Sequence, residues 1–224
     1  MHGSSALIAG ATGGLGRAIA TELASRGVTL TLAARDAGRL DGIDLEGRRV
    51  AVDLRDPNAC TAAVEAAVDH GGGLDVVVNA VGVVAFGAVD DLSIDVMEEL
   101  FLTNTFVSIG LAKAALPRLG KGATLVNLSG VIAEKNLPGM AAYGASKAAV
   151  RAFDEGLARE ARRYGIRVID ARPPHTETGL AERALAGQAP KMPAGLEPAG
   201  VARVIVDAIG DPAVRDLPSS AFGA

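Results

Sequence analysis

The stretch Ala6-Leu-Ile-Ala-Gly10-Ala-Thr-Gly-Gly14-Leu-Gly16-Arg17-Ala-Ile-Ala20 decides the fold that this sequence predicts. A short apolar run, typical of a buried strand, leads through a glycine-rich turn into helical spacing. Glycines let the backbone approach a pyrophosphate, which then accepts hydrogen bonds from free N–H groups at the helix N-terminus. The spacing is Gly-x-x-x-Gly-x-Gly, unlike the more general Gly-x-Gly-x-x-Gly. The turn therefore favours dinucleotide binding. The alternative is a tight turn between strand and helix that binds no ligand.

The rest of the chain alternates apolar strands with helical stretches. Strands are expected at residues 6–9, 28–33, 49–52, 74–79, 124–128 and 166–169, with a short edge strand at 215–217. Helices are expected at residues 15–25, 57–68, 95–119, 143–164 and 199–209, and a loop at 187–198. This alternation predicts right-handed βαβ units. The expected fold is α/β, one doubly wound, Rossmann-type parallel sheet with helices on both faces, forming one domain over residues 1–224.

Composition narrows the function classes. The net charge is −4, with no Lys/Arg block, so nucleic acid or an anionic membrane surface is not an expected partner. Cys60, the single cysteine, is expected to be a buried thiol in a reducing compartment, and the three histidines lack metal-ligand spacing. No apolar run reaches about 18 residues. We therefore expect a soluble, cytoplasmic protein without a metal.

Tyr143 and Lys147 form the first candidate for catalysis. Side chains four apart on a helix share one face, and a nearby ammonium favours the phenolate. We therefore expect Lys147 to pull the pKa of Tyr143 below its reference value of about 10, which suits proton transfer to or from a carbonyl or alcohol oxygen. On its own the pair is also typical of a solvated helix face.

Arg35 indicates which dinucleotide binds. An NAD site tends to carry Asp or Glu at the end of the second strand, whereas Arg accommodates a 2′-phosphate. Here the strand ends Ala33-Ala34-Arg35, and Asp36 comes only afterwards. Arg35, aided by Arg17 or Arg39, favours NADP over NAD; a surface arginine without a ligand is the alternative.

These pieces together resemble the short-chain dehydrogenase/reductase family over nearly the whole chain. Besides the glycines, the resemblance rests on Asp53, Asn79-Ala-Val-Gly82, Asn104, Tyr143-x-x-x-Lys147, and Thr178 five residues after Pro173. It implies hydride transfer between a nicotinamide and a carbonyl or secondary alcohol of a small organic substrate. Tyr143 would move the proton, Lys147 would activate it and contact the ribose, and Asn104 would hold a water of the proton relay.

The resemblance also implies a cofactor site and an assembly. The implied cofactor-binding residues are Gly10, Thr12, Gly13, Gly14, Leu15, Gly16, Arg35, Asp53, Leu54, Asn79, Ala80, Gly82, Tyr143, Lys147, Pro173, Thr176 and Thr178. A substrate loop is implied at about residues 174–198. A homodimer or homotetramer, paired along the helices around Asn104 and Tyr143, is the implied assembly.

The sequence departs from the family where a serine is usual, thirteen residues before the tyrosine. Gly130 stands there. Adjacent Ser129 would reach the site only if the glycine bends the strand end, because neighbouring strand residues point to opposite faces. His175, Thr176 or an ordered water are other candidate donors. Loss of one donor costs roughly 10²–10³ in rate. The alternative function is therefore an NADP-binding sensor or scaffold with weak or no turnover.

Overall fold

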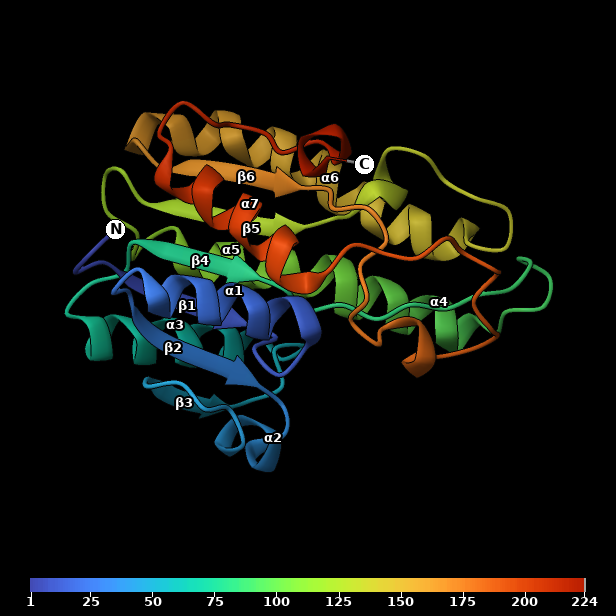
Figure 1. Cartoon of the computed structure of the whole chain (residues 1–224), viewed down its shortest axis with the longest axis horizontal. Coiled ribbons are helices and arrows are strands. Elements are labelled where there is room, and N and C mark those ends of the chain that lie inside the picture. The colour runs from blue at the N-terminus through green and yellow to red at the C-terminus, as the bar shows by residue number, and fades with distance from the viewer. Residues whose placement is uncertain (224) are drawn as a thin grey trace.

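The computed structural model describes residues 1–223, which contain one six-stranded parallel sheet. Its strand order is β3-β2-β1-β4-β5-β6, so the direction of winding reverses between β1 and β4. The strands are β1 (Ser5–Ala9), β2 (Thr29–Ala34), β3 (Arg48–Ala51), β4 (Val76–Asn79), β5 (Thr124–Leu128) and β6 (Arg167–Ala171). Their carboxyl ends lie along one edge, on the right in Figure 1.

Helices cover both faces of the sheet. They are α1 (Gly14–Ser25), α2 (Ala37–Asp41), α3 (Pro57–Gly71), α4 (Ile94–Leu100), α5 (Val107–Ala115), α6 (Ala141–Ala161) and α7 (Pro198–Gly210). In Figure 1, α1 and α7 lie in front of the sheet, and α3 and α5 lie behind it. Along β1, Ala6 and Ile8 join the hydrophobic core under α1 and α7, whereas Leu7 and Ala9 join the core under α3 and α5. The predicted α/β fold with both faces covered is confirmed, because strands buried on two sides need helices on both.

The helical stretch expected at residues 95–119 contains a wider turn. It runs as α4, a π-helical segment at Phe101–Phe106, and α5. A π turn displaces the residues that follow it relative to a regular α-helix, and such turns are frequent at functional sites. This segment carries Asn104.

The edge strand expected at residues 215–217 does not form. Leu217 makes only an isolated parallel bridge to Ala171, with hydrogen bonds from the Arg172 N–H to the Leu217 carbonyl and from the Leu217 N–H to the Asp170 carbonyl. Pro218 follows directly and has no N–H, so the ladder stops there.

The strand register builds a polar row beside the carboxyl edge. Asn79 in β4 is aligned with Asn127 in β5, which is aligned with Asp170 in β6. All three side chains are buried. Buried polar groups require hydrogen-bond partners, so this row must be satisfied from within the protein.

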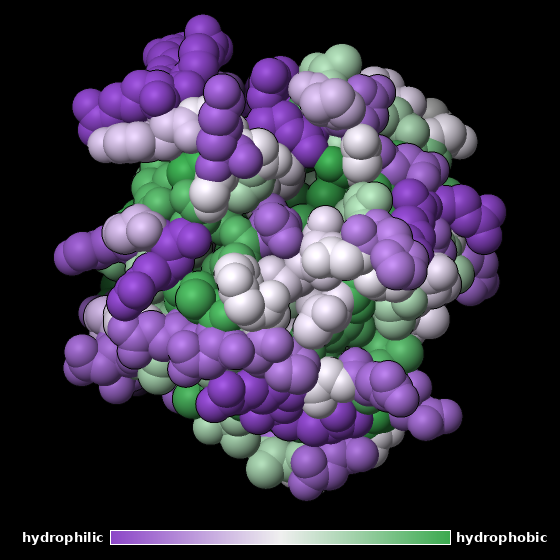
Figure 2. Space-filling model, turned by 90° about the vertical axis from the view of Figure 1, so that its left-hand side faces the viewer, coloured by the Kyte–Doolittle hydropathy of each residue, from purple (hydrophilic) through white to green (hydrophobic). Residues whose placement is uncertain are grey.

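The opposite side of the molecule, which carries the amino ends of the strands, shows mostly hydrophilic residues around smaller apolar areas (Figure 2). Within residues 1–223, each helix is too short or too polar to cross a membrane. Phe106 is 62% exposed on the helical face around Asn104. The homodimer or homotetramer expected along this face stays a prediction.

Gly16 provides a test of the turn between β1 and α1. A Cβ atom at Gly16 would overlap the carbonyl oxygen of Gly10, which is backbone and cannot swing aside. We expect Gly16→Ala to lower the free energy of unfolding by about 1–3 kcal/mol. The matched control is Gly156→Ala in α6, where an added Cβ meets nothing within 4 Å. That change is expected to raise stability by about 0.5–1 kcal/mol. Urea denaturation measures both, and an unchanged or more stable Gly16→Ala protein would contradict this packing.

Candidate functional site

Two adjoining cavities open at the carboxyl edge of the sheet. The first, here called the Tyr143 cavity, has a volume of about 300 Å³ and is lined by Tyr143 and Lys147. The second, the Arg35 cavity, has a volume of about 280 Å³. They share Gly13 and the Ala80–Gly82 turn, and so form one continuous cleft. The cleft lies where the strand order reverses between β1 and β4, which is where open α/β sheets bind ligands.

The glycine turn is shaped by close backbone approach. Gly10 has φ +79°, and a Cβ atom there would lie 2.8 Å from the backbone of Ala80. A Cβ at Gly14 would lie 2.7 Å from the Cβ of Thr178. At the start of α1, Gly13 occupies the N-cap position and provides no side-chain cap. Free N–H groups at an uncapped helix start suit an anion such as a pyrophosphate, so these residues fit a dinucleotide.

The Arg35 cavity brings together cationic and acidic groups. Arg35 and Arg39 both line it, and an Arg39 guanidinium N–H donates to the Thr12 carbonyl at 2.8 Å. Asp53 also lines it, and its hydrogen bonds from Arg55 hold the pKa of the carboxyl group below its usual range. Arg17 lines neither cavity. Of the two helpers expected for Arg35, the structure brings only Arg39 to the cleft.

Lys147 is buried at the junction of three elements. From α6, its Nζ donates to the Leu128 carbonyl at 2.8 Å, at the end of β5. A Cβ at Gly82 would lie 3.3 Å from this Nζ and 3.3 Å from Asn104 Oδ1, so Lys147 and Asn104 converge on the turn after β4. Burial lowers the pKa of Lys147 to about 8, opposed by the negative charge of Asp170.

The expected depression of the Tyr143 pKa is wrong for the free protein. Burial instead raises the pKa of Tyr143 to about 12. Desolvation destabilises the phenolate by more than the positive charge of Lys147, one helical turn away, stabilises it. Tyr143 is therefore protonated at neutral pH.

The side chain of Asn104 is held by hydrogen bonds to other residues of the chain. The Oδ1 accepts from the Val83 N–H at 2.9 Å, and the Nδ2 donates to the Val83 carbonyl at 3.0 Å and to Ser146 Oγ at 2.9 Å. The side chain thus fastens the π-helical segment to the turn after β4 and to α6. Its expected part in a proton relay stays a prediction.

Ser129 lines the Tyr143 cavity, but its hydroxyl is hydrogen-bonded within the protein. The side chain is fully buried, and Oγ donates to Asp170 Oδ1. Gly130 has φ +80° and ψ 163°, yet Ser129 still faces the same side as Asn127, two residues earlier. Strand alternation therefore persists to the end of β5, and the Ser129 proton is engaged by Asp170. The expected part of Ser129 as a donor to the substrate stays a prediction.

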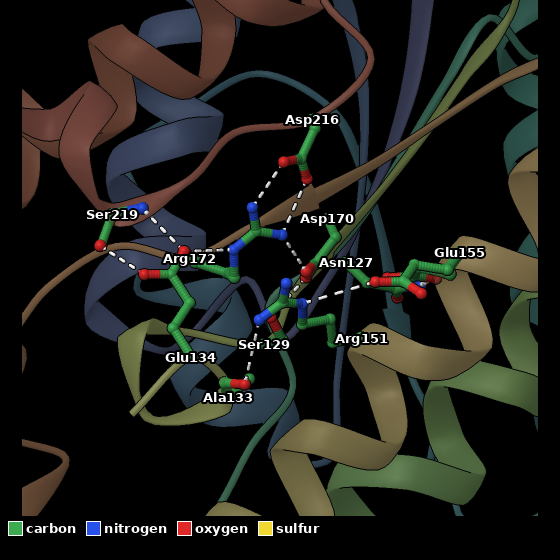
Figure 3. Close-up of polar contacts among 11 residues, drawn as sticks. Asn127, Ser129, Ala133, Glu134, Arg151, Glu155, Asp170, Arg172, Asp216 and Ser219 are labelled. Carbon is green, nitrogen blue, oxygen red and sulfur yellow. Dashed lines mark hydrogen bonds and ion pairs between the residues drawn. The ribbon is translucent and has the colours of Figure 1, made fainter. Parts of the chain in front are cut away.

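Arg172 occupies the centre of a buried ion-pair cluster beside Ser129 (Figure 3). Its guanidinium donates to Glu134 at 2.5 Å, to Asp170 at 2.5 Å, and to Asp216 at 2.6 and 2.8 Å. Ser219 donates to the same Glu134 carboxylate through its N–H and its hydroxyl. The cluster joins the end of β6, the short helix after Gly130, and the C-terminal segment. It fixes the wall of the cleft at Gly130.

Asp154 in α6 completes the polar row. Its Oδ1 accepts from Asn127 Nδ2 at 2.7 Å, and Asn127 Oδ1 accepts from Asn79 Nδ2 at 3.0 Å. Asp154 Oδ2 is buried and has no hydrogen-bond partner among the described residues. Burial raises the pKa of Asp154 to about 8, so the carboxyl group is largely neutral at pH 7.

Four charged residues beside the cleft were not expected from the sequence: Arg55, Asp154, Asp170 and Arg172. A signal for the last two was present, because Asp170 and Arg172 lie two apart where the apolar run of Val168 and Ile169 ends. Such charges face one side of a buried sheet and must be paired. The signal identifies a cluster but not its partners, which lie 38 and 44 residues away from Arg172.

Most of the expected cofactor-binding residues line the cleft. The Arg35 cavity contains Gly10, Thr12, Gly13, Arg35, Asp53, Leu54, Ala80 and Gly82. The Tyr143 cavity contains Gly13, Gly14, Leu15, Ala80, Gly82, Tyr143, Lys147, Pro173, Thr176 and Thr178. Gly16, Asn79 and Asn104 line neither cavity and support the walls from behind.

Known proteins are similar to this chain in sequence and in fold. A family model described as short chain dehydrogenase matches residues 4–189. Gluconate 5-dehydrogenase of Gluconobacter oxydans is 30% identical over 199 residues, which cover 84% of this chain and 77% of that protein. The chain belongs to the short-chain dehydrogenase family.

Solved structures of this family have the same fold. A short-chain dehydrogenase from Burkholderia cenocepacia in complex with NADP superposes with a TM-score of 0.86 at 27% identity, covering 100% of this chain and 99% of that one. An alcohol dehydrogenase from Thermococcus sibiricus, complexed with 5-hydroxy-NADP, gives a TM-score of 0.85 at 25% identity, covering 96% and 94%. Short-chain dehydrogenases use NAD or NADP, and this chain is accordingly a nucleotide-dependent oxidoreductase.

The Arg172 cluster generates a stability prediction. Arg172→Ala leaves Asp170 buried without its cation, and loss of one partner from a buried ion pair typically costs about 3–5 kcal/mol. Urea denaturation should show a loss of that size. Arg203→Ala, which removes an exposed arginine on α7, should stay within about 0.5 kcal/mol of the parent protein. Equal stability of the two variants would show that the cluster holds nothing in place.

Proposed function

We propose that this protein is an NADP-dependent oxidoreductase that reduces a carbonyl, or oxidises a secondary alcohol, of a small organic substrate. The observation that carries the proposal is the convergence of Tyr143, Lys147 and the turn at Gly82 in one cavity with the glycine loop. When bound, reduced NADP supplies the hydride. The residues of the chain supply the proton, the orientation of the reactants and a site shielded from water.

Tyr143 acts as the acid in the reductive direction. With a pKa near 12 it holds its proton at neutral pH and donates it to the substrate oxygen as negative charge develops there. Lys147, held by the Leu128 carbonyl, places a positive charge one helical turn away, which makes the phenol a stronger acid. The same ammonium is positioned to contact the nicotinamide ribose.

The missing serine leaves His175 as the leading donor to the substrate oxygen. Gly130 offers no hydroxyl, and the hydroxyl of Thr176 donates to the Pro174 carbonyl at 2.9 Å. His175 lines the Tyr143 cavity, with its Nε2 3.5 Å from Glu177 Oε1. An imidazole has a ring N–H that can donate a hydrogen bond, which makes His175 the side chain proposed for this role.

NADP is proposed over NAD because two arginines and no free carboxylate line the end of β2. Arg35 and Arg39 suit a 2′-phosphate, whereas Asp53 is occupied by Arg55. The NADP complexes of the related structures support the same choice.

An NADP-binding sensor or scaffold with weak turnover is the second candidate. Gly130 favours it, because one donor is absent at the reacting oxygen. The retention of Tyr143, Lys147 and Asn104 in their converging arrangement favours the enzyme instead.

Replacing Tyr143 tests the proposed reaction. Tyr143→Phe should lower kcat/KM for NADPH-dependent reduction of a reactive dicarbonyl by about 10²-fold or more, because the proton donor is removed. Tyr164→Phe changes the other, 55% exposed tyrosine and should leave the rate unchanged. Wild-type kcat/KM should fall as pH rises through about 8, where Lys147 loses its charge. NADPH binding without any wild-type turnover would favour the sensor.

Charge reversal at the Arg35 cavity tests the cofactor. Arg35→Asp should weaken NADPH binding and shift the preference towards NADH, because an aspartate repels a 2′-phosphate and accepts hydrogen bonds from ribose hydroxyls. Arg17→Asp makes the same change of charge outside the cleft and should leave the preference nearly unaltered. Fluorescence titration with both cofactors measures this. Equal affinity for NADPH and NADH before and after Arg35→Asp would contradict the assignment.

A further inference from the structure

The substrate end of the Tyr143 cavity is walled by a small apolar cluster. Val84, Phe86, Ile132 and Met140 are each at most 8% exposed, and all four line the cavity. They come from the segment after β4, the short helix after Gly130, and the residue before α6. Tyr143 packs against the same cluster. The proton donor therefore faces a site whose nearest walls are hydrocarbon.

The segment at residues 180–187 is hydrogen-bonded to the residues that follow β4, beside this cavity. The Leu185 N–H donates to the Val84 carbonyl at 2.8 Å, and the Phe86 N–H donates to the Ala186 carbonyl at 2.9 Å. Gly187, with φ +68°, lies so close to the Phe86 carbonyl that a side chain would overlap it. These contacts hold Leu180 against the apolar cluster. This segment thus adds the apolar side chains of Leu180 and Ala181 to the cavity lining, together with the charged side chains of Glu182 and Arg183.

Charged side chains other than Lys147 lie in the surrounding loops and not in the cluster. Glu177 accepts from the Gly195 N–H at 2.6 Å, and Glu182 is exposed. Arg183 donates to the Thr178 carbonyl at 3.3 Å, where the two cavities meet. A carboxylate on a bound substrate would lose its hydration against the hydrocarbon of the cluster, and the two carboxylates that line the cavity, Glu177 and Glu182, outnumber the one guanidinium, Arg183.

Gly130 widens the same cavity. A Cβ there would meet only the Pro173 carbonyl oxygen, at 3.8 Å. The wall at Gly130 therefore leaves the space of a side chain free within the cavity, which favours a substrate with a bulky substituent.

We propose that the preferred substrate is an uncharged, apolar ketone of alicyclic or branched form, and that ketones carrying a carboxylate are excluded. This inference rests on the proposed reductase function and adds the substrate class. The selectivity comes from the desolvation of a charge in the apolar cluster, and not from a repelling group at the reacting carbon.

A matched pair of ketones tests the inference. 4-Methylcyclohexanone and 4-oxocyclohexanecarboxylate share the ring and the carbonyl and differ only in the remote methyl or carboxylate group. We expect kcat/KM with NADPH to be about 100-fold or more higher for the methyl ketone. Calorimetric binding of both ketones to the complex with NADP⁺, in which no reduction can occur, should show the same order of affinity.

Two variants locate the selectivity. Leu137 is 44% exposed and lines the Tyr143 cavity, so Leu137→Lys places a cation at the apolar wall without burying it. It should reduce the preference for the methyl ketone by about tenfold. Leu102→Lys introduces the same charge at a 38% exposed leucine outside both cavities and should leave the preference unchanged.

The binding measurement separates the two proposals. Preferential binding of the methyl ketone without reduction of either ketone would uphold the substrate class and overturn the reductase. Equal or tighter binding of the carboxylate would overturn the substrate class even if turnover is observed. The absence of binding by both ketones would overturn it as well.

Discussion

Burial of the Lys147 ammonium is the interaction on which the site depends. The side chain is 7% exposed, so its charge persists only because protein groups take the place of water. The Leu128 carbonyl accepts its hydrogen bond, and Asp170 supplies compensating charge. Both belong to the carboxyl ends of neighbouring parallel strands. A shift of β5 against β6 would therefore remove the support of the lysine and the geometry of the cleft together.

The polar row behind the cleft explains why that register is fixed. Asn79, Asn127 and Asp154 are joined by hydrogen bonds across β4, β5 and α6, and a slip by one residue would bury each of them without a partner. Arg172 pairs there with three carboxylates, those of nearby Asp170 and of Glu134 and Asp216, which are distant in sequence. Such clusters add specificity more readily than they add stability. Here they determine where Gly130 and the short helix after it can lie.

Gly130 matters through its backbone conformation as well as through the absence of a hydroxyl group. With φ +80° and ψ 163° it occupies a region that is essentially restricted to glycine, where other residues cost about 1–3 kcal/mol. A serine placed there would have to move the strand end to relieve that strain. The apolar cluster and the open space beside Pro173 suggest that this geometry serves the fit of a substrate.

The sequence predicted those features that depend on residues close together in the chain. The apolar runs, the glycine turn and the spacing of Tyr143 and Lys147 gave the alternating fold and the end of the sheet where the cleft lies. The predicted direction of the Tyr143 pKa shift was wrong because desolvation depends on all the groups packed around the ring. The spacing of Tyr143 and Lys147 carries no information about those groups. The bond between the Ser129 hydroxyl and Asp170 could not be predicted either, because the two residues lie 41 positions apart in the sequence. The apolar cluster could not be predicted from the sequence, because Val84, Ile132 and Met140 come together only in the folded chain.

The most direct test of the central claim is isotope transfer from NADPH deuterated at the transferring position of the nicotinamide. The protein is incubated with this cofactor and a neutral cyclic ketone, and the alcohol is analysed by mass spectrometry. The account predicts one deuterium on the former carbonyl carbon with wild type and essentially none with Tyr143→Phe. Tight binding of NADPH with no labelled alcohol from wild type would contradict it, leaving a cleft that binds the nucleotide without using it.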